Sequence, residues 1–178
     1  EFLSKFKTKV AALKLGDPMD DATQIGPMAR LDLRAALHRQ VTDSIAQGAV
    51  AVTGCKPVER DGFFYQPSIL DQVTAKACAY HEELFGPVAI MIRAANEADA
   101  LRIANETRFG LGSSIWSKDV ARAEQLAAHI QAGCTFINGM VKSDPRLPFG
   151  GVKASGYGRE LSKLGIHEFV NAKTVWIR

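Results

Sequence analysis

This 178-residue sequence lacks several features that are typical of particular classes of protein, and each absence argues against one of those classes. The net charge is only +3 and the lysines and arginines are scattered, so we expect no nucleic-acid partner. No apolar run approaches the roughly 18 residues of a membrane-spanning helix, and no signal-peptide pattern opens the chain. Internal repeats and low-complexity linkers are also missing. What remains is a globular domain with one sizeable hydrophobic core and no membrane association.

Cysteine is scarce, with Cys55, Cys78 and Cys134 widely spaced and no Cys-x-x-Cys motif. The odd number and the lack of a nearby histidine pair argue against a disulfide framework and a structural zinc site, and predict a reduced, cytoplasmic protein. No base or cationic cluster adjoins Cys55 or Cys134 to lower the pKa of the thiol. We therefore expect all three cysteines to be structural, and the four histidines form no metal-ligand spacing.

The start of the chain has no initiating methionine and lies inside a helical pattern. Apolar side chains recur at helical spacing from the second residue onward, at Phe2, Phe6, Val10 and Leu13. No capping residue precedes them. We therefore expect the sequence to be part of a longer protein that continues upstream of Glu1.

Apolar periodicity predicts an α/β fold. After the first helix and a loop rich in glycine and proline, helices are predicted over residues 31–47, 96–107, 120–130 and 160–164, and strands over residues 49–53, 63–70, 88–92, 111–116, 134–137 and 173–178. From residue 88 onward, the order strand, helix, strand, helix, strand predicts right-handed crossovers in a parallel sheet.

Local signals add detail to these elements. Asn96, with Asp99 three residues on, is a predicted helix N-cap, and Ser117 is the predicted cap of the helix over residues 120–130. Pro67 lacks an N–H group, so it is expected to confine its strand to an edge or a bulge. The short apolar run over residues 49–53 is predicted to be a buried strand.

Glycine is concentrated in residues 147–160, a stretch that we call the glycine loop. It holds four glycines, one proline and two aromatic residues in fourteen positions. A long structural turn is one interpretation. Phosphate binding is the other, and the spacing argues against it. Gly156 is not followed by the Lys-Ser/Thr pair of a Walker loop, and the third glycine of a dinucleotide fingerprint is missing.

Three polar loops at predicted strand ends are candidate sites, namely residues 81–87, 138–149 and 156–160. Glu82 and Glu83 are explained most simply as solvated side chains, yet they precede a sharp turn that can hold one of them toward a cleft. A carboxylate there suits ribose hydroxyls, because it accepts several hydrogen bonds. Arg159 and Glu160 form an interior ion pair or support a nearby site. From the residues alone, no catalytic set is complete.

Four ordered motifs resemble the aldehyde dehydrogenase superfamily, and the resemblance extends over essentially the whole chain. They are EELFGPV at 82–88, FIN at 136–138, PFGGVKASG at 148–156 and GREL at 158–161. The resemblance implies that residues 1–171 are the C-terminal part of a parallel-sheet catalytic domain and residues 172–178 an oligomerisation strand. It also implies that the cofactor-binding domain, the nucleophilic cysteine and the general-base glutamate lie upstream of Glu1, so no catalytic residue of that kind is in this chain.

The same resemblance assigns roles to four residues. Glu83 matches the glutamate that holds the nicotinamide ribose of NAD or NADP, and Phe85 matches the aromatic residue that positions the nicotinamide. Phe149 matches an aromatic residue of the substrate tunnel, and Glu160 a glutamate linked to the catalytic water. The strand over residues 172–178 implies pairing with a neighbouring subunit, in a homodimer or homotetramer.

Two further stretches, residues 143–147 and 165–171, resemble bacterial succinate-semialdehyde dehydrogenases. Ser143 falls where those enzymes have a serine that contacts the substrate carboxylate. The alternatives are an aldehyde dehydrogenase of general specificity and a catalytically silent structural relative.

The 178-residue chain by itself is expected not to oxidise aldehydes, because its residues include no activated thiol and no dinucleotide fingerprint. The measurement is aldehyde-dependent formation of NADH or NADPH by the purified chain. Formation above the rate of a no-protein control contradicts this prediction.

Overall fold

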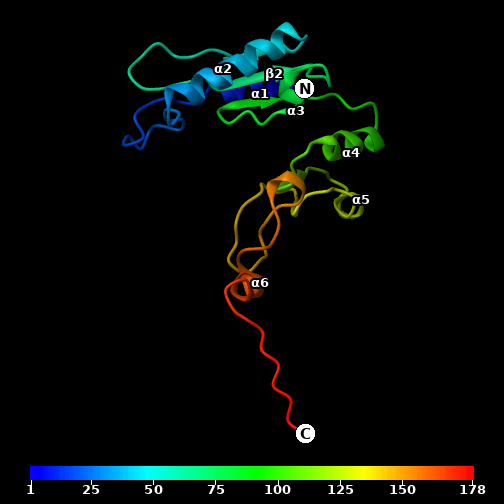
Figure 1. The fold of residues 1–178 in the computed structure, drawn as a ribbon. Coiled ribbons are helices and arrows are strands. Elements are labelled where there is room, and N and C mark those ends of the chain that lie inside the picture. The colour runs from blue at the N-terminus through cyan, green and yellow to red at the C-terminus, as the bar shows by residue number, and fades with distance from the viewer. The chain divides into compact units, whose positions relative to one another are not determined.

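The computed structural model describes residues 1–178, which divide into two compact units, Glu1–Arg93 and Ala94–Arg178. Figure 1 labels the helices α1 to α6 and the strand β2. Each unit carries its own sheet and helices, and strands within each sheet include a parallel pair. The predicted α/β class is therefore confirmed. The predicted domain boundary at residue 171 stays a prediction.

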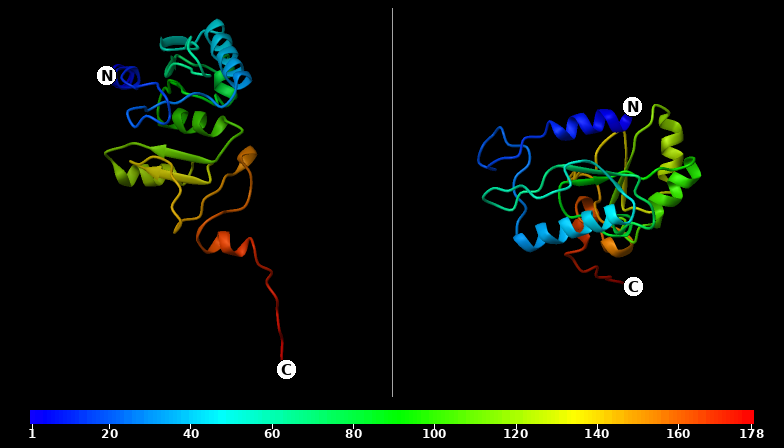
Figure 2. Two further views of the ribbon diagram at one scale, coloured as in Figure 1. Left: turned by 90° about the vertical axis from the view of Figure 1, so that its left-hand side faces the viewer. Right: turned by 90° about the horizontal axis from the view of Figure 1, so that it is seen from above.

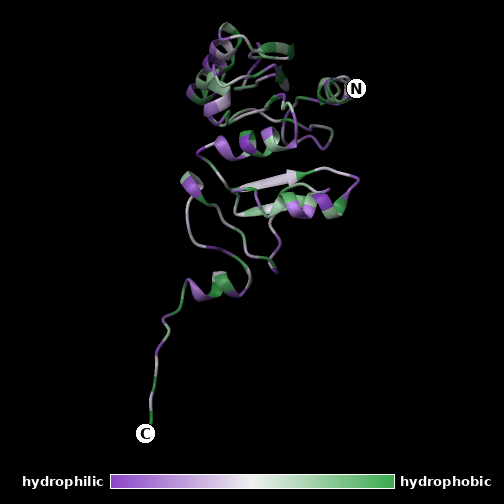
Figure 3. Cartoon of the chain, turned by 90° about the vertical axis from the view of Figure 1, so that its right-hand side faces the viewer, coloured by the Kyte–Doolittle hydropathy of each residue, from purple (hydrophilic) through white to green (hydrophobic).

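The first unit is built on a three-stranded sheet in the order β1-β2-β3, with β1 antiparallel and β3 parallel to β2. Its elements are α1 (Phe2–Ala11), α2 (Leu31–Ala46), β1 (Val50–Thr53), β2 (Ser68–Asp71), α3 (Cys78–His81) and β3 (Val88–Ile90). Both long helices agree with the apolar periodicity. In Figure 3 hydrophilic and hydrophobic residues alternate along the helices, as this periodicity requires.

The core of the first unit joins α2 to the sheet. Leu37 and Val41, one helical turn apart, are 1% and 0% exposed and share a buried cluster with Leu70 of β2 and with Tyr65. All four residues of β2 are buried. The central strand is therefore covered on both faces, which fixes the position of the loops at its ends.

Two predictions for this sheet were wrong, the first of them only in part. The strand after Pro67 is central and not an edge, because β2 begins at Ser68 and Pro67 occupies no position in the ladder. The alternative of a bulge agrees with a shift in the β1–β2 register between Ala51 and Thr53. Ser68 N donates to Pro87 O at 2.8 Å, so the pairing starts directly after the proline. The run over residues 49–53 is not a buried strand either, since Val50 is 43% exposed at the edge of the sheet.

The second unit contains a two-stranded parallel sheet joined by a helical crossover. Its elements are α4 (Glu97–Glu106), β4 (Gly112–Ile115), α5 (Val120–Ala127), β5 (Cys134–Ile137), the 3₁₀ turn η1 (Lys153–Ser155) and α6 (Ser162–His167). Figure 2 shows β4 and β5 side by side, in register from Gly112 opposite Cys134. The predicted sheet through residues 88–137 was wrong in one respect: β3 pairs with β2 in the first unit, and only β4 and β5 pair here.

Helix caps in the second unit follow side-chain chemistry. Asn96 Oδ1 accepts from Asp99 N at 2.9 Å, which confirms the predicted N-cap of α4. The cap of α5 is Asp119, whose Oδ1 accepts from Arg122 N at 3.0 Å, and not the predicted Ser117. Ser117 Oγ accepts instead from Asp119 N, because Ser117 lies two residues before the N-cap position.

Residues 171–178 follow α6 without regular structure (Figure 1). Their large apolar side chains, Val175, Trp176 and Ile177, are 72–88% exposed. A strand needs a hydrogen-bonded neighbour, and this segment has none in the chain. The strand expected there is therefore not observed, and its pairing with another subunit stays a prediction. None of the helices combines the length and the apolar content needed to span a membrane.

Candidate functional site

The glycine loop is closed by backbone pairing between Phe149 and Glu160. Phe149 N donates to Glu160 O at 2.9 Å, and Glu160 N donates to Phe149 O at 2.8 Å. These reciprocal bonds make one rung of an antiparallel ladder across the loop. Two residues that the sequence singled out separately are thus held opposite each other. Between them, Gly156 and Gly158 adopt φ values of +118° and +78°, which favour glycine.

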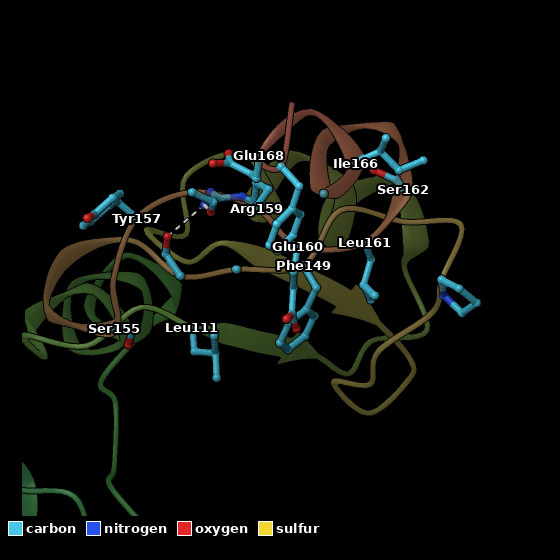
Figure 4. A pocket seen from close by; sticks show the side chains of 16 residues that line it. Leu111, Phe149, Ser155, Tyr157, Arg159, Glu160, Leu161, Ser162, Ile166 and Glu168 are labelled. Carbon is cyan, nitrogen blue, oxygen red and sulfur yellow. Dashed lines mark hydrogen bonds between the residues drawn. The ribbon is translucent and has the colours of Figure 1, made fainter. Parts of the chain in front are cut away.

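Arg159 braces this loop from within. Its Nη1 donates to Gly151 O at 2.9 Å and to Gly158 O at 2.6 Å, and Figure 4 shows the guanidinium directed into the loop. No ion pair joins it to Glu160, so the interior ion pair considered from the sequence is not formed. The guanidinium instead satisfies carbonyl groups that the tight turns leave unpaired.

The buried backbone of Gly110 connects the loop to the sheet. Gly110 O accepts from Gly133 N at 3.0 Å and from Val152 N at 2.9 Å, and Gly110 N donates to Ser155 Oγ at 3.0 Å. A Cβ atom on Gly110 would come within 2.6 Å of Gln131 O, so only glycine fits. The sequence offered no signal for this role beyond the glycine itself.

Lys153 fastens the loop to a helix end. Its Nζ donates to Asn105 O at 2.7 Å and to Thr107 O at 3.1 Å, at the C-terminus of α4. A cation there satisfies carbonyls that no helical N–H reaches, and it opposes the negative end of the helix dipole. Lys153 adopts φ +55°, a conformation that L side chains rarely take.

A hollow of about 880 Å³ lies over the closed loop, within the second unit (Figure 4). Phe149 and Glu160 line it, as do Arg159, Leu161 and Glu168. Ser143 does not line this hollow and is exposed. The structure therefore brings together Phe149 and Glu160 but does not bring Ser143 to them.

Ser143 lies in a loop whose start is fixed by Asn138, at the carboxyl ends of β4 and β5. Asn138 Oδ1 accepts from Ser117 N and its Nδ2 donates to Ser117 O, both at 2.9 Å. The side chain thereby continues the pairing of the two strands by one further rung. Asn138 has φ +53°, a conformation that asparagine tolerates better than most residues.

In the first unit, Gln40 binds the adjacent residues Glu82 and Glu83 in different ways. Its Nε2 donates to Glu82 Oε2 at 2.8 Å and to the backbone O of Glu83 at 3.3 Å. The Glu82 carboxylate is thus engaged by the protein, while the Glu83 carboxylate is exposed and makes no hydrogen bond within the chain. Phe85, two residues on, is 73% exposed. This arrangement leaves Glu83 available to accept hydrogen bonds from a ligand.

The sequence matches the aldehyde dehydrogenase family over residues 1–175. The chain belongs to that family. It is 51% identical over 176 residues to a succinate-semialdehyde dehydrogenase [NADP(+)] of Mycobacterium avium, an alignment that covers 99% of this chain and 37% of the relative.

Two solved structures resemble this aldehyde dehydrogenase chain. A succinic semialdehyde dehydrogenase from Streptococcus pyogenes in complex with NADP+ is 37% identical, with a TM-score of 0.93 over 98% of this chain and 39% of that one. An aldehyde dehydrogenase of Mycobacterium tuberculosis complexed with NAD+ is 37% identical, with a TM-score of 0.89 over 94% and 35%. The chain thus spans somewhat more than a third of the length of these relatives.

The cysteines of this aldehyde dehydrogenase chain have the environment of structural residues. Burial raises the pKa of the Cys55 thiol and also that of Cys134. Cys78 Sγ lies 3.1 Å from Ser44 Oγ and from Gln40 O, between α2 and α3. Raised pKa values disfavour the thiolate that a nucleophile needs, which supports the structural role expected for Cys55 and Cys134.

Replacing Lys153 by methionine is expected to lower the free energy of unfolding by about 1 kcal/mol, because two helix-end carbonyls lose a charged donor. Urea denaturation of the purified protein measures this change. The control is Lys163→Met, which removes an exposed lysine of α6 that makes no hydrogen bond within the chain. Equal changes in both variants contradict the anchoring role of Lys153.

Proposed function

We propose that this chain acts within an NAD(P)+-dependent aldehyde dehydrogenase that oxidises succinate semialdehyde to succinate. The observation that carries the proposal is the 51% identity, across nearly the whole chain, to a relative named succinate-semialdehyde dehydrogenase [NADP(+)]. The proposal assigns the nucleophilic cysteine and the general base to the part of the relatives' length that this chain does not span. It also assigns a cytoplasmic location.

The cofactor role falls to the loop around Glu83. When bound, NAD(P)+ supplies the acceptor for the hydride that leaves the substrate. Glu83 would hold the ribose hydroxyls, and the unengaged state of its carboxylate fits that role. Phe85 would place its exposed ring against the nicotinamide. Relatives bind either cofactor, as the NADP+ complex from S. pyogenes and the NAD+ complex from M. tuberculosis indicate.

The substrate role falls to the second unit. Phe149 would form part of the wall of the substrate tunnel, and Ser143 would donate a hydrogen bond to the carboxylate at the far end of the substrate. Glu160, held opposite Phe149, would support the hydrolytic water through intervening groups. Residues 172–178 would pair with a neighbouring subunit of a homodimer or homotetramer, using backbone groups that have no partner in this chain.

In the enzyme that contains this chain, Glu83→Gln is expected to slow hydride transfer. The amide keeps the shape but weakens a charge-assisted hydrogen bond that contributes at most about 1.5–3 kcal/mol, and hydride transfer depends on nicotinamide orientation. Single-turnover kinetics measure the rate. Glu82→Gln is the matched control, because the Glu82 carboxylate is already bonded to Gln40. A hydride-transfer rate unchanged by Glu83→Gln would falsify the assignment.

Ser143→Ala in the same enzyme is expected to lower kcat/KM for succinate semialdehyde roughly tenfold or more. Losing a hydrogen bond to a carboxylate costs about 1.5–3 kcal/mol, and about 1.4 kcal/mol corresponds to one decade. Butanal has a similar length and no carboxylate, so its kcat/KM should barely change. Equal losses on both aldehydes mean that Ser143 only supports its loop, and an aldehyde dehydrogenase of general specificity then replaces the present proposal.

A further inference from the structure

The residues directly after Ser143 form a tight turn whose sequence suits its geometry. Leu147 N donates to Asp144 O at 2.9 Å, which closes a β-turn over residues 144–147. Aspartate is favoured at the first position of such a turn and proline at the second, and this turn has Asp144 and Pro145 there. Asp144 Oδ1 also accepts from Arg146 N at 3.0 Å. The backbone beside Ser143 is therefore held by two hydrogen bonds that Asp144 accepts.

An ion pair reinforces the turn. Arg146 Nε donates to Asp144 Oδ1 at 2.9 Å, and Arg146 Nη2 donates to Asp144 Oδ2 at 2.6 Å. This is the bidentate geometry of the stronger arginine–carboxylate pairs. The Asp144 side chain is only 19% exposed, whereas the Arg146 side chain is 84% exposed. The less exposed Asp144 is thus the more restricted side chain of the pair, and its two hydrogen bonds hold the Arg146 side chain against the turn.

Both members of the pair stay charged over the pH range of enzyme assays. Hydrogen bonds from Arg146 lower the pKa of Asp144 to about 2, below its ordinary value of 3.8. A lowered carboxyl pKa means that the contribution to stability is complete above about pH 4 and is lost only as the pH falls toward 2. Between pH 6 and 9 the Asp144 carboxyl therefore stays ionised and able to accept from Arg146.

A second anchor ties the turn to the element that follows the glycine loop. Ser162 N, at the first residue of α6, donates to Pro145 O at 3.1 Å. At its other end the loop is held by the amide of Asn138 on the backbone of Ser117. Ser143 lies between these anchors and makes no hydrogen bond of its own within the chain.

We propose that Asp144 and Arg146 are positioning residues that fix Ser143 for the substrate carboxylate and so determine specificity without contacting the reacting aldehyde. This inference rests on the proposed function. Its physical basis is orientation: one hydroxyl on an open loop binds a carboxylate well only if the loop need not be ordered on binding. The guanidinium of Arg146 is already engaged by Asp144, so its role is to close the turn.

The test uses Asp144→Ala, Arg146→Ala and the double variant in the enzyme that contains this chain, with succinate semialdehyde and butanal as substrates. Each single variant is expected to raise KM and lower kcat/KM for succinate semialdehyde about five- to tenfold, with butanal unchanged. The double variant should lose no more than either single variant, because both break the same unit. Asp144→Asn keeps the acceptor for Arg146 N and should recover part of the loss.

Lys142→Ala is the matched control, since it removes a neighbouring positive charge but none of the hydrogen bonds of the turn. If Arg146→Ala lowers kcat/KM for succinate semialdehyde and Asp144→Ala does not, the proposal is overturned, because Arg146 then contacts the substrate carboxylate directly. Equal losses on butanal overturn it too, because the turn then only supports the fold. If Asp144→Ala and Arg146→Ala leave kcat/KM unchanged while Ser143→Ala lowers it for succinate semialdehyde only, the positioning role is contradicted and the proposed function is kept. If Ser143→Ala lowers kcat/KM equally for succinate semialdehyde and butanal, the proposed function itself is contradicted.

Discussion

The backbone pairing of Phe149 with Glu160 is the constraint on which the second unit depends. It converts a stretch rich in glycine into a closed loop, and the carbonyls that the loop turns inward are taken up by Arg159. The loop is then joined to the sheet through the backbone N–H and C=O of Gly110 and to α4 through Lys153. Two strands of four residues each carry little stability alone, so these attachments define the unit as much as the strands do.

In the first unit, the residues that follow α3 include one carboxylate that the chain binds and one that it leaves exposed. Gln40 on α2 binds the Glu82 side chain and the Glu83 backbone, so the two adjacent glutamates acquire different surroundings. The packing of Leu37 and Val41 against β2 holds α2 in place and with it Gln40. The different surroundings of the two carboxylates thus depend on a residue more than 40 positions earlier in the chain.

The amino-acid sequence was informative wherever a short-range pattern acts alone. The helices α1, α2 and α4, the Asn96 cap and the parallel β4–α5–β5 unit all follow from local periodicity and capping chemistry. The sequence was misleading where two neighbouring residues can both act as the N-cap of a helix. Ser117 and Asp119 are both good caps, and only the start of the helix decides between them. Pro67 likewise excludes a central strand only if it lies inside the ladder, and β2 begins one residue later.

The ordered motifs of the chain were enough to indicate the aldehyde dehydrogenase family, because their order and spacing resemble those of that family, to which the chain belongs. Contacts between distant residues were not accessible in that way. The pairing of Phe149 with Glu160, the engagement of Arg159 by carbonyls and the attachment of Lys153 to α4 join residues through the folded chain. Hydrogen-bond partners far apart in sequence are selected by packing, so only the tertiary structure decided them.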